Sequence, residues 1–133
     1  MPIVGHGIDL VETARIARML EDHGERFLHR CFTLTEREYA AVSRKRAVEH
    51  LAGRFAAKEA VLKALGTGWS GGITWTDVEI VRSDGKHTGP PTVRLHGRAA
   101  AVAHNAGATR WWLSISHVPG HAVASAIAES HPS

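Results

Sequence analysis

Two lysines and a glutamate lie close together in one alanine-rich segment of the chain, residues 54–66. Glu59 and Lys63 are four residues apart, so they share one side of a helix. Lys58 falls on the apolar side of the same helix, where an unpaired charge is costly. The apolar side is defined by residues at helical spacing: Leu51, Phe55, Leu62 and Leu65. A half-buried carboxylate flanked by lysines could hold a metal ion and a phosphate group.

A purely structural role is the competing interpretation of these three residues. An ion pair between Glu59 and Lys63 would stabilise the helix by only about 0.2–0.5 kcal/mol, and such pairs are common on helices. Lys58 could carry its charge to solvent along its aliphatic stem. Taken alone, the segment therefore leaves both interpretations open.

Two distant segments offer further chemistry. Asp9 ends an apolar stretch, where a carboxylate either binds a ligand or, as this segment alone favours, caps the next helix. Ser116 and His117 suggest nucleophilic catalysis, but neighbours on a strand point to opposite faces, and no G-x-S-x-G motif is present. The pair is better suited to hydrogen-bonding a phosphate or another ligand edge, unless His117 is simply one of ten histidines at the surface.

Composition narrows the class of protein. A length of 133 residues predicts a single domain, 1–133, with its own core, and no apolar run approaches the roughly 20 residues that span a bilayer. No signal peptide is expected. The single cysteine, Cys31, rules out an internal disulfide and a cysteine-based zinc site, and it favours a reducing cytoplasm. The net charge is +3, and the basic run Arg44–Arg46 is either a solvated helix face or a surface for an anionic partner.

The order of expected elements predicts an α+β fold with an antiparallel sheet packed on a long helix. Strands are expected at Ile3–Leu10, Thr74–Arg82, Thr92–His96, Arg110–His117 and Ala122–Glu129. Helices are expected at Ala14–Asp22, from a capping box at Thr35–Glu38, at Ala47–Leu65 and at Gly97–Asn105. Thr13 would cap the first helix, Gly66 would end the long one in a left-handed conformation, and Ser83–Lys86 would form a turn.

Three segments are far more specific together than any one of them alone. They read GIDLVE at 7–12, GRFAAKEA at 53–60 and SISH at 114–117, in this order over most of the chain. From Ile3 to about Ala128 the chain resembles the holo-acyl-carrier-protein synthase family, the small bacterial type of 4′-phosphopantetheinyl transferase. The resemblance implies transfer of the 4′-phosphopantetheine arm of coenzyme A to a serine of apo acyl-carrier protein. Adenosine 3′,5′-bisphosphate is the other product, and the implied pathway class is fatty-acid and lipid biosynthesis.

The resemblance also implies roles for individual residues. Matched by motif, Asp9 and Glu59 bind a magnesium ion, which prefers carboxylates, water and phosphate oxygens. Lys63 neutralises a phosphate oxygen, and Glu59 accepts the serine proton, directly or through water. The coenzyme A contacts match Lys45, Arg46, Lys63, Gly66, Ser116 and His117. The acidic carrier docks on the first helix, where the matched residues are Arg15, Met19, Arg26 and Phe27.

The family forms homotrimers with active sites between subunits, so Glu59 and Lys63 would face Ser116 or His117 of a neighbouring copy. No membrane or nucleic-acid partner is implied. Two features depart from the family pattern. His6, close to Asp9 in sequence, either makes metal or carrier binding pH-sensitive or is an exposed bystander, and the pair Trp111-Trp112 would thicken the interface or the core.

Two other functions compete with this interpretation. A basic, non-catalytic nucleic-acid-binding domain is favoured by the positive charge and the tryptophans, but the chain has no recognisable recognition module. A Ser–His hydrolase is opposed by the strand geometry of Ser116 and His117. The natural carrier and the preference between Mg²⁺ and Mn²⁺ stay open, since carboxylates suit either ion.

Overall fold

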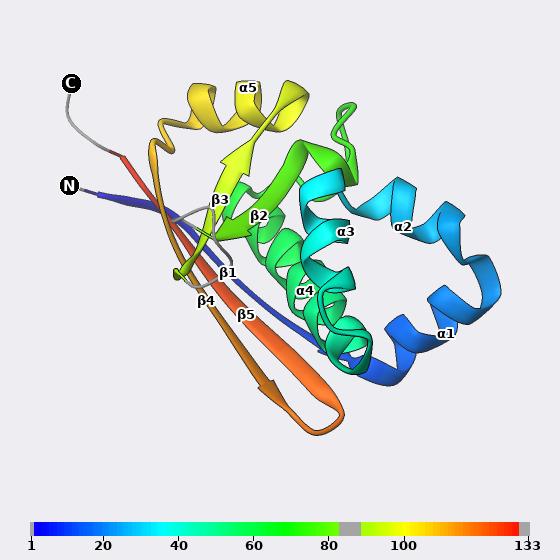
Figure 1. Ribbon diagram of the computed structural model, residues 1–133. Coiled ribbons are helices and arrows are strands. Elements are labelled where there is room, and N and C mark those ends of the chain that lie inside the picture. Colours follow the sequence, from blue (N-terminus) through cyan, green and yellow to red (C-terminus); the bar gives the residue numbers. More distant parts are fainter. Residues whose placement is uncertain (1, 83–88, 131–133) are drawn as a thin grey trace.

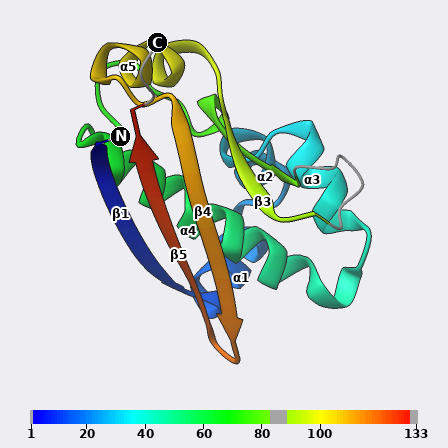
Figure 2. The same ribbon diagram turned by 90° about the vertical axis from the view of Figure 1, so that its left-hand side faces the viewer.

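A long helix, α4 (Ala47–Leu65), lies against one face of an antiparallel sheet in the computed structural model, which describes residues 2–82 and 89–130 (Figure 1). The sheet has the strand order β1-β5-β4. Its strands are β1 (Ile3–Glu12), β5 (His121–Glu129) and β4 (Arg110–Val118). Figure 2 looks onto the sheet with α4 behind it, so one face of the sheet is covered and the other is open.

The remaining elements surround the side of α4 that faces away from this sheet. Three helices follow β1: α1 (Thr13–His23), α2 (Glu25–Cys31) and α3 (Leu34–Ala41). A separate antiparallel ribbon pairs β2 (Val78–Arg82) with β3 (Pro91–Leu95), and α5 (Gly97–Ala106) leads from it to β4. Two 3₁₀ turns, η1 (Arg44–Arg46) and η2 (Trp75–Asp77), precede α4 and β2. Within the described ranges, every helix is too short or too polar to cross a membrane.

Most elements expected from the sequence are confirmed, and so is the α+β fold with its antiparallel sheet on a long helix. Helix α4 has the expected bounds and ends at Gly66, whose φ of 78° is left-handed. Strand β4 alternates as expected, with Trp111, Leu113 and Ile115 packed on the core. The expected turn at Ser83–Lys86 lies outside the described residues.

The structure differs from the expected elements in four places. Strand β1 continues to Glu12, so Asp9 lies inside the strand and Thr13 is the first residue of α1 rather than its cap. The capping box of α3 is built by Thr33 and Glu36, not from Thr35, because Thr33 has the extended backbone that a cap requires. No periodic signal predicts α2, which has seven residues and buries only two side chains. Helical turn η2 takes the place of the expected strand start at Thr74.

Two glycines bring β1 into direct contact with the backbone of α4. A Cβ atom added to Gly5 would lie 1.8 Å from the Ala64 carbonyl oxygen, and one added to Gly7 would lie 1.9 Å from the Ala60 carbonyl oxygen. Real Cβ atoms do not approach other atoms so closely, so any larger residue would push the strand off the helix. The two contacts, Gly5 on Ala64 and Gly7 on Ala60, together fix the position of β1 along the axis of α4.

Lys58 does not extend to solvent, contrary to one possibility raised by its sequence position. Its Nζ lies 2.8 Å from a carboxylate oxygen of Glu36, and both side chains are fully buried. Lys58 also donates to the carbonyls of Trp75 and Val78, while Glu36 accepts from the Ile80 N–H at 2.8 Å. Burial lowers the pKa of Lys58, and the Glu36 carboxylate opposes that effect. The network ties α4 to α3, η2 and β2.

We expect Gly7→Ala to lower the free energy of unfolding by at least about 2 kcal/mol, because the new Cβ would collide with the α4 backbone. Urea unfolding of the purified variant measures the change. The control is His6→Ala on the same strand, whose exposed side chain should cost less than about 1 kcal/mol. Equal unfolding free energies for Gly7→Ala and the wild type would contradict the close approach.

Lys58→Met should lower the free energy of unfolding by about 3–5 kcal/mol, because it leaves the Glu36 carboxylate buried without a counter-charge. Adding Glu36→Gln should recover much of this loss, since glutamine keeps an acceptor for the Ile80 N–H. Urea unfolding of the single and double variants compares the two. A double variant no more stable than Lys58→Met would show that the unpaired charge is not the cause.

Candidate functional site

Asp9 and Lys63 meet where β1 crosses α4. The Lys63 Nζ lies 3.0 Å from Asp9 Oδ1, and it also donates to the Ile8 carbonyl at 3.0 Å. The Asp9 side chain is only 18% exposed, whereas that of Lys63 is 54% exposed. The partner of Lys63 is therefore Asp9, and the simple helical pair between Glu59 and Lys63 is not formed.

Glu59 lies on the same side of α4, one turn before Lys63. Gly5 contacts Ala64 and Gly7 contacts Ala60, so β1 runs towards the N-terminal end of α4. Two strand residues advance about as far as four helical residues. Asp9, two residues beyond Gly7, therefore lies level with the helical turn that ends at Glu59. The Glu59 carboxylate is partly buried and has no hydrogen bond or ion pair with any described residue.

The donor set of Asp9 and Glu59 fits a hard cation. Among the described residues, one carboxylate oxygen of Asp9 and both of Glu59 have no partner. Magnesium is typically held by one or two carboxylates together with water and substrate phosphate oxygens. Across residues 2–82 and 89–130, no group of three or more His, Cys, Asp or Glu side chains could hold a metal without such help.

The expected coenzyme A contacts divide into two groups along α4. His117 Nε2 donates to the Glu49 carbonyl at 2.9 Å, and Gly53 leaves the space for its ring. Lys45 and Arg46 form η1 just before α4, so they belong to this N-terminal group. Glu49 and Lys63 are 14 residues apart, which corresponds to about 21 Å of helix. One chain therefore does not bring His117 beside Lys63, and the hydrogen bond of His117 also leaves no Ser–His catalytic pair.

Gly66 lies at the C-terminal end of α4, in the group with Lys63. A Cβ added to Gly66 would meet nothing within 4 Å, so its backbone faces open space. Gly66 is therefore an exposed position at this end of α4, three residues after Lys63. His6, by contrast, points to the open face of the sheet, opposite to Asp9, and shares a 3.1 Å hydrogen bond with Ser125.

A buried guanidinium without a carboxylate partner lies beside the N-terminal group. Arg54 is 2% exposed, its central carbon lies 4.0 Å from the centre of the Tyr39 ring, and its Nε has no hydrogen-bond partner. Arg82 donates to the Tyr39 hydroxyl at 3.1 Å and also keeps an unpartnered buried Nε. Buried cations in such excess attract an anion.

The electrostatics of this region point the same way. Burial lowers the pKa of His50, and the positive charges of Arg54, His117 and Arg46 lower it further. Burial likewise lowers the pKa of Arg54. Burial is the largest cause of both pKa shifts. Positive neighbours add to it at His50, whereas at Arg54 the lowering by Arg82 is opposed by Tyr39 and Glu36.

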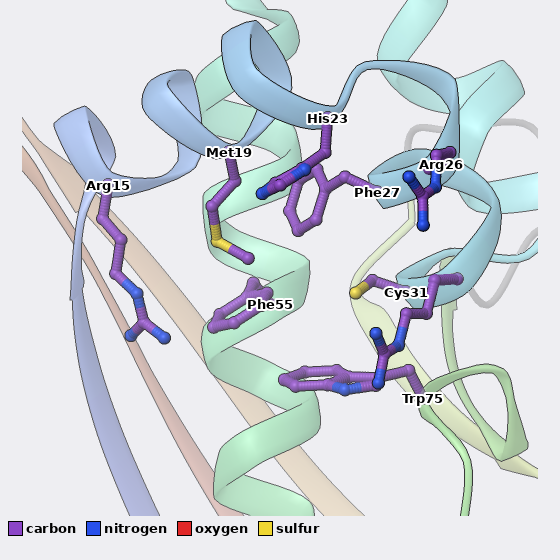
Figure 3. A pocket seen from close by; sticks show the side chains of 9 residues that line it. Arg15, Met19, His23, Arg26, Phe27, Cys31, Phe55 and Trp75 are labelled. Atoms are coloured by element: carbon purple, nitrogen blue, oxygen red, sulfur yellow. The ribbon is translucent and has the colours of Figure 1, made fainter.

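A cavity of about 630 Å³ opens between α1, α2 and α4 (Figure 3). All four residues expected to contact a carrier protein line it: Arg15, Met19, Arg26 and Phe27. Phe55 and Trp75 complete an apolar wall, and the Arg15 guanidinium lies 5.3 Å from the centre of the Phe55 ring. Positive charge surrounds apolar surface here, which suits an acidic partner that presents an apolar side chain.

Sequence reasoning missed several of these residues. Arg54 stands beside Phe55 on the buried side of α4, so a helical wheel could have marked it as Lys58 was marked. Arg30 lines the cavity from α2, which has no distinctive pattern, and His23 is the last residue of α1, one position beyond the expected end of that helix. Trp75 lies in η2, and no local signal predicts that it packs against α4.

The amino-acid sequence of this chain is similar to those of known proteins over most of its length. The holo-[acyl-carrier-protein] synthase of Koribacter versatilis is 50% identical over 127 residues, covering 96% of this chain and 98% of that protein. The corresponding protein of Gloeobacter violaceus is 46% identical over 89% of this chain and 86% of that protein.

Solved structures agree with these relatives. The holo-[acyl-carrier-protein] synthase of Neisseria meningitidis superimposes with a TM-score of 0.85 at 33% identity, over 97% of this chain and 100% of that one. The Bacillus anthracis synthase, solved in complex with CoA (3′,5′-ADP), has a TM-score of 0.78 at 37% identity, over 97% and 98% of the two chains. The sequence-family model that describes the 4′-phosphopantetheinyl transferase superfamily matches residues 5–124 of this chain. The chain therefore belongs to this superfamily.

Proposed function

We propose that this protein is a transferase that moves the 4′-phosphopantetheine arm of coenzyme A to a serine of apo acyl-carrier protein. The observation that carries the proposal is the ion pair of Asp9 and Lys63 on the side of α4 that also carries Glu59, whose carboxylate has no partner among the described residues. The names of the relatives, and the coenzyme A complexes among the solved structures, support the same reaction.

The reaction explains why the chain needs no nucleophile of its own. The acceptor serine oxygen attacks the phosphorus that carries the pantetheine arm, and the bond to the second phosphate of the diphosphate breaks. Adenosine 3′,5′-bisphosphate leaves with the bonding electrons. Glu59 accepts the serine proton, directly or through water, and Lys63 neutralises a phosphate oxygen. The exposed ammonium of Lys63 can reach a ligand while Asp9 holds it in place.

Asp9 and Glu59 would hold the magnesium ion. When bound, the ion supplies charge neutralisation and orients the diphosphate. Asp9 is held by Lys63 through one oxygen, which leaves the other available to the ion. The partly buried Glu59 carboxylate would then both bind the metal ion and accept the serine proton.

The coenzyme A site uses both groups of residues on α4. Gly66 and Lys63 bind the diphosphate end, while Ser116 and His117 contact the nucleotide. Lys45 and Arg46 bind the 3′-phosphate, and the buried Arg54, whose Nε has no partner among the described residues, adds a further cation. The nucleic-acid-binding alternative would leave the paired acids at Asp9 and Glu59 without a purpose.

The separation of these groups within one chain supports a homotrimer with active sites between copies. The sheet face opposite α4 exposes large apolar side chains, including Ile8, Leu10 and Trp112. Exposed apolar surface of this kind is typical of a protein interface. A neighbouring copy on this face could bring its His117 towards Lys63.

The carrier protein would dock at the cavity lined by Arg15, Met19, Arg26 and Phe27. Acyl-carrier proteins are acidic, so the arginines would attract them, and the apolar wall would accept a side chain from the partner. This role accounts for the positive charge of the chain without nucleic acid. A reducing cytoplasm, where the lone Cys31 would stay a thiol, is the compartment we propose.

The direct test incubates the protein with coenzyme A, Mg²⁺ and apo acyl-carrier protein and reads the carrier by intact mass. We expect the mass of one phosphopantetheine to be added. Glu59→Gln should lower the turnover about 100-fold or more, because it removes the base and a metal ligand. Glu49→Gln, the same change at an exposed position of α4, is the control.

Two outcomes would contradict this reaction or its assignment. Wild-type protein that modifies none of several carriers, yet binds RNA or DNA with a steep salt dependence, would favour the nucleic-acid-binding alternative. A Glu59→Gln variant that binds Mg²⁺ and keeps near-normal turnover would remove Glu59 from the catalytic role.

Arg15→Glu should raise the KM for the carrier about 10-fold or more and leave the KM for coenzyme A within about twofold. The reason is that Arg15 lines the cavity beside Phe55 and is not one of the residues assigned to coenzyme A. Steady-state kinetics with each substrate varied in turn measure both constants. Arg18→Glu, a matched charge reversal on α1 outside this cavity, is the control, and an equal loss in both KM values for Arg15→Glu would remove the assignment.

A further inference from the structure

Three aromatic rings form a continuous stack at the edge of the cavity. Trp75 stacks on Phe55 with ring centres 4.6 Å apart and an angle of 25° between the rings. Trp69 stacks on Trp75 with centres 3.8 Å apart and an angle of 29°. Phe55 and Trp69 share no ring contact in the described part of the chain, so Trp75 lies between them.

Trp75 is held from more than one side. Its backbone carbonyl accepts a hydrogen bond from the buried Lys58 Nζ at 2.9 Å, which fixes η2 against α4. Its ring lines the cavity beside Phe55, as Figure 3 shows. Lys58 and Phe55 are fully buried, whereas Trp69 is partly buried and packs against the core.

Trp69 belongs to a segment with little other attachment. It lies between Gly66 and Gly72 in a stretch without regular structure, and its neighbours Gly68 and Ser70 are exposed. Besides the Trp69 ring, the main link from this segment to the rest of the fold is the hydrogen bond from Arg98 Nε to the Gly71 carbonyl at 3.1 Å. The Nε1 atom of Trp69 is buried without a partner, so the ring is held by stacking rather than by a hydrogen bond.

We infer that Trp69 is a positioning residue for the acceptor: it holds the Trp75 ring in the cavity wall that receives the carrier protein. This inference rests on the proposed function of the cavity. The segment around Trp69 is otherwise polar and rich in glycine, and fixing the indole in place there costs conformational entropy. The favourable interaction that offsets this cost is the stacking of the Trp69 ring on Trp75. Without this ring, one face of Trp75 loses its support and the wall can rearrange into the cavity.

The test separates the two substrates kinetically. Trp69→Leu keeps an apolar side chain but removes the flat ring, and it should raise the KM for apo acyl-carrier protein about three- to tenfold. The KM for coenzyme A and the kcat should stay within about twofold of wild type. Trp69→Phe, which can still stack, should restore the carrier KM to within about twofold. Trp69→Met gives the same test should the leucine variant fail to fold.

The control is Arg98→Ala, which releases the Gly71 carbonyl without touching the stack. It should leave the carrier KM unchanged. An unchanged carrier KM in Trp69→Leu, an equal rise in both KM values, or a matching effect of Arg98→Ala would overturn the inference. A wild-type protein that modifies no carrier would instead overturn the proposed function, so the two failures are distinguishable.

Discussion

The candidate site depends on the backbone contact between β1 and α4. Two residues without side chains, Gly5 and Gly7, let the strand lie directly on the carbonyls of Ala60 and Ala64. This contact sets the level of Asp9 along the helix and brings its carboxylate to Lys63. Two candidate site residues from distant segments are therefore placed by a packing constraint between backbones.

The buried charges of the protein fall into two kinds with different meanings. Lys58 and Glu36 neutralise each other and bond to surrounding backbone groups, so the pair is complete and ties four elements together. Arg54 is about as buried but stacks on Tyr39, and it forms no ion pair with a carboxylate of the described residues. A buried cation of this kind is a candidate for ligand binding, whereas a fully paired lysine and glutamate serve the architecture.

Much of this architecture could be predicted from sequence because its signals are local. The long helix, its end at Gly66 and the alternation of β4 follow from periodicity and from glycine conformation. The partners of Lys58 and Lys63 could not be predicted, since Glu36 and Asp9 come from segments far away in the chain. The capping box at Thr33 was misplaced by two residues because threonines at 33 and 35 offer similar local patterns. The stack of Trp69 and Trp75 is likewise a tertiary feature without a local signature.

We propose that Asp9 and Glu59 lie together across the β1–α4 contact and share one metal ion with the diphosphate of coenzyme A. An anomalous diffraction map of crystals grown with coenzyme A and Mn²⁺ in place of Mg²⁺ tests this arrangement. We expect one strong peak within coordination distance of a carboxylate oxygen of Asp9 and of Glu59, and of the diphosphate. A peak bound to the diphosphate alone, with both carboxylates turned away, would contradict it.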